Sequence, residues 1–126
     1  MIHVSILVPE TAVPQAIVDP RYMFTAVNGF LVQAGKEPLF DVQLVAMTET
    51  IPLNDGVVTI KADALLKDVV KTDLVIVPAL SGDVRVALDR NKDMVPWIVA
   101  QYYKGAEVAS LCIGAFLLAN TGLLNG

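Results

Sequence analysis

The only cysteine of the chain lies in an apolar stretch near its C-terminus, where a thiol could act as a nucleophile. Glu107–Leu111 is typical of a buried strand, and the residues from Gly114 onward have helical spacing. Cys112 therefore stands on the kind of sharp turn that raises a side chain above a sheet. The N–H groups of Ile113 and Gly114 would favour its thiolate and could stabilise an oxyanion. The position allows a functional cysteine, but a single cysteine is more often a buried core residue.

Partners for this thiol are scarce. A reactive cysteine needs a base or an orienting group. His3, the only histidine, lies near the start of its expected strand, roughly 16 Å from the carboxyl end at about 3.3 Å per residue, so we expect no Cys–His dyad. Glu10 follows that strand and could approach Cys112, or it could be a solvated loop carboxylate. No His/Cys cluster has ligand spacing, so we expect no metal and no cofactor.

Strand and helix patterns alternate along the chain. Strand patterns are found over 3–9, 39–47, 72–80 and 107–111. Within 54–62, Asp55–Gly56 predicts a turn that continues as a short strand. Helical spacing predicts helices over 20–34, 63–71, 91–105 and 114–122. This order is typical of α/β proteins. We expect one domain over 1–126, with a three-layer, flavodoxin-like, mostly parallel sheet and helices on both faces.

Boundary residues refine these helices. Asp19 is expected to cap the first one, with Pro20 at its first position and Gly35 as its stop. Asn91 or Asp93 is expected to start the helix that precedes Gly105.

The expected sheet places three strand ends at one edge. In such sheets ligands bind outside the carboxyl ends of the strands, near a topological switch point. The ends are Val8–Glu10, Pro78–Gly82 and Leu111–Cys112. Glu10, Ser81 and Gly82 therefore join Cys112 as candidate ligand-binding residues, although Ser81 and Gly82 also suit a plain turn.

Composition limits the classes of function. The 126 residues are 55% hydrophobic and 17% charged, so the sheet is buried on both faces or the chain buries surface against a partner. The nine Lys and Arg are scattered and the net charge is −4, which argues against direct nucleic-acid binding.

Localisation signals point to the cytoplasm. A single cysteine suits a reducing compartment, and the N-terminus lacks a signal peptide pattern. The uncharged residues after Glu107 approach the length of a membrane span, but Ser110, Asn120, Thr121 and the glycines among them oppose that interpretation.

The C-terminal segment resembles a known family. Residues 105–126 resemble the cysteine turn of the DJ/PfpI superfamily, and more narrowly the N-terminal, class I glutamine amidotransferase-like domain of AraC/XylS-type transcription regulators. The matching residues are Ser110, Cys112, Gly114, Ala115, Phe116, Leu118, Ala119, Gly122, Leu123, Leu124 and Gly126. A weaker match is the helix pattern of Pro20, Phe24 and Asn28.

The resemblance implies a sensory and dimerisation domain. It would bind a small molecule near Cys112 without turnover and form a homodimer, and DNA would be bound by a helix-turn-helix domain outside this chain.

The chain departs from the family pattern in three places. Superfamily enzymes place a Glu where this chain has Ala16, and 79–82 replace a common glycine pair. The family's Thr-His-Trp segment is not reached, so we expect a domain truncated at its C-terminus. The alternatives are a small cysteine-dependent hydrolase, hydratase or glyoxalase-like enzyme, with Cys112 catalytic, and a dimerisation scaffold with a vestigial pocket.

Overall fold

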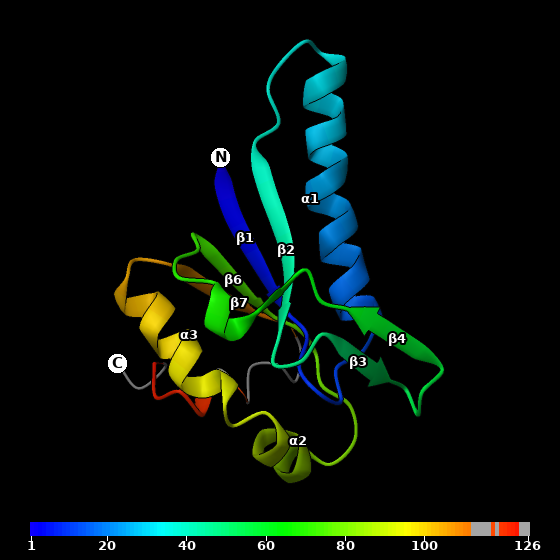
Figure 1. Cartoon of the computed structure of the whole chain (residues 1–126), viewed down its shortest axis with the longest axis vertical. Helices are drawn as coiled ribbons and strands as arrows, with labels where there is room; N and C mark the ends of the chain where they lie inside the picture. The colour runs from blue at the N-terminus through cyan, green and yellow to red at the C-terminus, as the bar shows by residue number, and fades with distance from the viewer. Residues whose placement is uncertain (112–116, 118, 124–126) are drawn as a thin grey trace.

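The centre of the protein is a five-stranded sheet in the order β5-β2-β1-β6-β7, in which every neighbouring pair is parallel (Figure 1). The computed structural model describes residues 1–111, 117 and 119–123. The strands are β1 (Ile2–Leu7), β2 (Phe40–Ala46), β5 (Ala64–Leu65), β6 (Leu74–Val77) and β7 (Glu107–Ser110). β1 and β6 are adjacent although the chain visits β2 and β5 between them, so the topological switch point lies between β1 and β6.

Side chains of the sheet divide between two cores. Because successive residues of a strand point to opposite faces, Val4 and Ile6 enter one core and Leu7 enters the other. The first, the α1 core, contains Val4, Ile6, Val8, Ala12, Ile17, Leu44, Ala46, Ile51, Leu53, Ile60 and Ile76. The second, the α3 core, contains Leu7, Val45, Val75, Val77, Leu80, Ala87, Met94, Ile98, Ala106 and Leu117.

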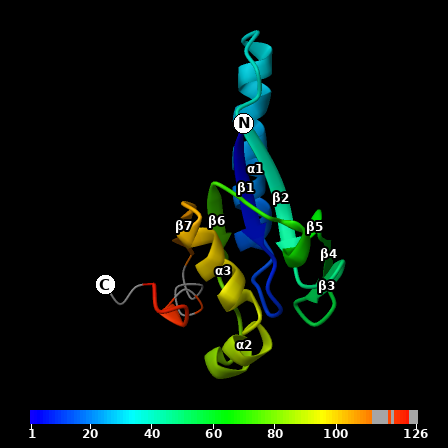
Figure 2. The ribbon, with the colours of Figure 1, turned by 60° about the vertical axis from the view of Figure 1, so that its left-hand side comes forward.

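Helices cover both faces, which confirms the expected three-layer α/β fold (Figures 1 and 2). The helix α1 (Gln15–Gln33) and a hairpin of β3 (Thr50–Leu53) and β4 (Val58–Lys61) pack on the α1 core. On the other face lie α2 (Val84–Arg90) and α3 (Met94–Tyr103). The short helical turn η1 (Leu66–Asp68) follows β5.

The start of α1 differs from the expectation. The helix begins at Gln15, with Pro14 as its N-cap residue, and it contains Pro20. Asp19 is therefore an internal residue and no cap, because Pro14 already supplies a fixed backbone angle at the start of the helix. The expected stop is confirmed: Gly35 has φ +75° and Lys36 N donates to Leu31 O at 2.8 Å, which closes a Schellman motif.

Three further elements depart from the expected pattern. The expected helix over 63–71 is the two-residue β5 followed by η1, because Asp63 bonds to Leu44 through both its main chain and its carboxylate. Neither β3 nor α2 was expected. Asn91 is the C-cap residue of α2, so Asp93 is the residue before α3.

The final expected helix lies largely outside the described residues. Leu117 and Ala119 are helical, and Leu117 is fully buried in the α3 core.

Candidate functional site

Loops that follow β1 and β6 are tied together at the carboxyl edge of the sheet. Thr11 O accepts hydrogen bonds from Ser81 N at 2.7 Å and from Ser81 Oγ at 2.9 Å. Val13 N donates to Ala79 O at 2.8 Å. Leu111, which follows β7, donates its N–H to Val77 O at 2.9 Å. The structure therefore brings the ends of β1, β6 and β7 to one edge.

An apolar cavity of about 450 Å³, here called the Leu111 cavity, opens at this edge. It is lined by Val13, Gln15, Ala16, Asp19, Pro20, Met23, Ala79 and Leu111. Leu111 is the residue directly before Cys112. Cys112, Ile113 and Gly114 themselves lie outside the described residues, so their predicted contacts with a ligand stay predictions.

Residues in the first turns of α1 decide which chemical groups line the Leu111 cavity. Ala16, the position at which superfamily enzymes are expected to carry Glu, lines it and offers only a methyl group. Pro20 has no N–H, so the carbonyl of Ala16 lacks its usual helical donor. Among the described lining residues, Asp19 carries the only carboxylate, and its side chain is exposed.

A second, polar cleft of about 490 Å³, here called the Arg90 cleft, lies on the other side of the loop after β1. Its lining residues are Thr11, Pro52, Leu53, Asn54, Asp55, Gly56, Ser81, Gly82 and Arg90. It thus contains two of the predicted site residues, Ser81 and Gly82. The expected Asp55–Gly56 turn forms the tip of the hairpin. Because neither β3 nor α2 was expected, the sequence did not predict that this tip lies beside Arg90.

Positive φ angles gather around the Arg90 cleft; they are ordinary in the hairpin turn at Asn54 and Asp55 and unusual at Thr11. Thr11, Asn54 and Asp55 are the described non-glycine residues with positive φ, at 68°, 53° and 54°, and all three line the cleft. For a β-branched residue such as Thr11 this conformation is uncommon. The Oγ1 of Thr11 is also buried without a hydrogen-bond partner. Strained and unpaired groups of this kind concentrate at functional sites.

Glu10 has a structural role through its main chain, not through its carboxylate. Its main chain is held by the buried side chain of Asn91, which accepts from Glu10 N at 2.7 Å and donates to Glu10 O at 2.8 Å. The Glu10 side chain is exposed, and Glu10 is not among the described residues that line the Leu111 cavity or the Arg90 cleft.

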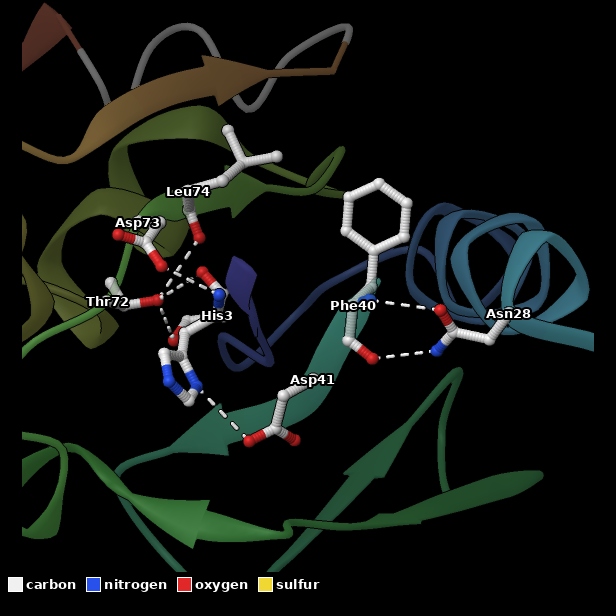
Figure 3. A network of polar contacts seen from close by, with 8 residues as sticks. His3, Asn28, Phe40, Asp41, Thr72, Asp73 and Leu74 are labelled. Carbon is white, nitrogen blue, oxygen red and sulfur yellow. Dashed lines mark hydrogen bonds and ion pairs between the residues drawn. The ribbon is translucent and has the colours of Figure 1, made fainter. Parts of the chain in front are cut away.

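His3 lies at the opposite, amino edge of the sheet. Its Nδ1 is 3.1 Å from Asp41 Oδ2 and its main-chain N–H donates to Asp73 Oδ2 at 2.8 Å (Figure 3). Because β1 and β7 run parallel to β6, His3 is separated from the end of β7 by the length of the sheet.

The described part of the chain was searched for metal-binding groups and for membrane-spanning helices. There, no group of three or more His, Cys, Asp or Glu residues is arranged to hold a metal ion. The described helices are all too short or too polar to cross a lipid bilayer.

Comparison with known proteins gives matches at the level of structure. No protein-family model matches the chain, and no curated protein sequence matches it. A protein from Vibrio parahaemolyticus, provisionally described as a transcriptional regulator, superposes with a TM-score of 0.81 at 21% identity over 98% of this chain and 63% of its own. A ThiJ/PfpI family protein from Pseudomonas syringae gives 0.78 at 17% identity, over 98% of this chain and 47% of its own.

A third match names the same fold. A two-domain protein from Anabaena variabilis, with DJ-1/ThiJ/PfpI-like and ferritin-like domains, gives a TM-score of 0.65 at 25% identity over 98% of this chain and 33% of its own. The chain thus spans less than two thirds of the length of these three structures. The described residues have the fold of the DJ-1/ThiJ/PfpI superfamily, as the sequence resemblance implied.

Proposed function

We propose that residues 1–126 are the ligand-sensing and dimerisation domain of an AraC-type transcription regulator. The domain binds a small molecule near Cys112 without turnover, and DNA is bound by a separate domain. The structural likeness to a protein described as a transcriptional regulator supports this class.

The single observation that carries the proposal is the lining of the Leu111 cavity. This cavity, lined by the residue that precedes Cys112 in the sequence, offers a small molecule mostly apolar surface, and Ala16 cannot accept a proton. A cysteine nucleophile needs a nearby base. The described lining therefore suits binding better than catalysis.

A cysteine-dependent enzyme is the second candidate, and one observation favours it. Asp19 lies one helical turn after Ala16 and lines the same cavity. Its carboxylate could serve as the missing base.

Turnover assays separate the two candidates. We expect the protein to act on p-nitrophenyl acetate and on methylglyoxal no faster than its Cys112→Ser variant does. Activity that is lost in both Cys112→Ser and Asp19→Asn, and kept in Asp83→Asn, would support the enzyme instead. Asp83 is a suitable control because it caps α2 and does not line the cavity.

The coding sequence downstream of Gly126 tests the regulator class directly. We expect it to encode two helix-turn-helix units. A stop codon after a short extension that contains histidine would contradict the proposal.

A further inference from the structure

Three cavities at the carboxyl edge adjoin one another through lining residues that they share. A small hollow of about 290 Å³ shares Asn54 and Ser81 with the Arg90 cleft. It shares Val13 and Gln15 with the Leu111 cavity. We call the three together the edge groove; it runs from the hairpin tip and α2, across the loop after β1, to the first turns of α1.

The edge groove continues into a fourth hollow that is entirely apolar. This hollow, of about 330 Å³, shares Pro20, Met23 and Leu111 with the Leu111 cavity. Phe24 and Phe40, whose rings meet edge to face at 4.9 Å, also line it. The groove therefore changes from polar at the Arg90 end to apolar at the Phe24 end.

Two groups at the polar end have no side-chain partner among the described residues. Arg90 forms no ion pair there, although its guanidinium carries five donors. Thr11 Oγ1 is buried without a partner. Asp55, on the hairpin tip, is the carboxylate that also lines this cleft, and it forms no ion pair with Arg90. The Arg90 guanidinium suits an oxyanion, and Thr11, whose buried hydroxyl has a free donor, belongs to the same lining.

We propose that the edge groove binds an amphipathic carboxylate. The carboxylate group lies in the Arg90 cleft, where Arg90 pairs with it and Thr11 donates a hydrogen bond. The alkyl or aryl body follows the groove past Val13 to the Leu111 cavity. This inference rests on the proposed function, because it names the class of the sensed molecule.

Calorimetric titration with linear carboxylates tests the groove. We expect saturable binding of butanoate, hexanoate and octanoate, with affinity rising about fourfold for each added methylene that leaves water. Octan-1-ol has the same body without the charge, and it should bind at least tenfold more weakly than octanoate.

Matched variants locate the two ends of the ligand. Arg90→Gln should weaken octanoate about tenfold or more and leave octan-1-ol unchanged. Arg85→Gln, on the same helix but outside the cleft lining, should change neither. Ala16→Phe should fill the Leu111 cavity and weaken octanoate more than butanoate. Val18→Phe, an exposed position on α1, is its control.

The Thr11→Val variant separates a ligand-binding role of Thr11 from a purely structural role. It keeps the β-branched shape and removes the unpaired hydroxyl, so we expect the melting temperature to hold or rise while octanoate binds several-fold more weakly. A lower melting temperature with unchanged binding would count against a ligand role for Thr11.

Several outcomes would overturn the inference. They are no octanoate binding at millimolar concentration, equal effects of Arg90→Gln and Arg85→Gln, or inorganic phosphate binding as tightly as octanoate. The proposed function would survive each of these if the downstream gene encodes helix-turn-helix units. Conversely, octanoate binding with no such units would leave the groove assignment intact and remove the regulator.

Discussion

At the scale of single residues, Asn28 shows how one side chain fixes a helix to a strand. Its Nδ2 donates to Phe40 O at 2.7 Å, and its Oδ1 accepts from Phe40 N at 2.9 Å (Figure 3). The same Oδ1 accepts from Leu39 N at 2.9 Å. These bonds join α1 to the first residue of β2. They give a physical reason for an asparagine at the position that the family pattern singled out.

Asn28→Ala should lower the free energy of unfolding by about 2–3 kcal/mol, because main-chain groups at the start of β2 lose their partners. Thr25→Ala is the control, since Thr25 Oγ1 bonds only to carbonyls of its own helix. Urea denaturation measures both. Equal small losses in the two variants would mean that water replaces the Asn28 bonds at no cost.

Cys112 carries a second prediction at this scale. If its sulfur stands at the start of a helix, the pKa of the thiol is lowered and the thiolate reacts at neutral pH. We expect iodoacetamide to alkylate Cys112 faster than it alkylates glutathione at pH 7. A rate that rises only above pH 8 would indicate an ordinary thiol.

The sequence predicted the place of part of the candidate site. Ser81 and Gly82 lie at the carboxyl edge, as expected because strand ends of a parallel sheet share an edge, and their ligand-binding role stays a prediction. Thr11, Asn54 and Arg90 were not found, because they meet only through the hairpin and α2. Thr11 in particular gives no sequence signal, since a β-branched residue at positive φ contradicts local preference.

At the scale of elements, one glycine within α1 and one just after it should respond to substitution with opposite changes in stability. Gly29 is inside the helix and Gly35 follows it with φ +75°, and neither has an atom within 4 Å of the place that a Cβ would occupy. Gly29→Ala should therefore raise the free energy of unfolding by about 1 kcal/mol.

Gly35→Ala should lower it by about 1 kcal/mol, because an L residue is strained in the left-handed region. Thermal and urea unfolding of the two variants, each measured against the parent, check the pair. Changes of the same sign would show that backbone conformation does not decide the cost at these positions.

Elements that the sequence did not predict have weak local signals. β3 contains Pro52, which argues against a strand and is tolerated in a two-stranded hairpin. Residues 84–86 of α2 alternate apolar and charged, as a strand would. The helix there depends on Asp83, whose carboxylate accepts from the main chain of Arg85 and Val86. By contrast, β6 was predictable from its continuous apolar run, and β1 and β2 from runs that are mostly apolar.

At the scale of the whole molecule, α1 leaves large apolar side chains in solvent. Tyr22, Met23, Phe30 and Val32 are 70%, 66%, 71% and 58% exposed. Exposed apolar surface of this extent is typical of an interface. It supports the proposed homodimer, with α1 as the contact element.

Phe30→Lys should weaken self-association at least tenfold, since a charge at an apolar interface is costly. Val70→Lys is the control, because Val70 is equally exposed at 74% and lies before β6. Sedimentation velocity at micromolar concentration measures both variants. A monomeric parent protein would contradict the dimer.

The hydrogen bonds that join Thr11 to Ser81 have a mechanical consequence. A molecule that displaces one of these loops displaces both, because Thr11 O accepts the main-chain and side-chain bonds of Ser81 together. Pro14, where α1 starts, is three residues further along the same loop. A ligand in the cleft that moved Thr11 would therefore also act on the start of α1, the helix that exposes Tyr22 and Phe30.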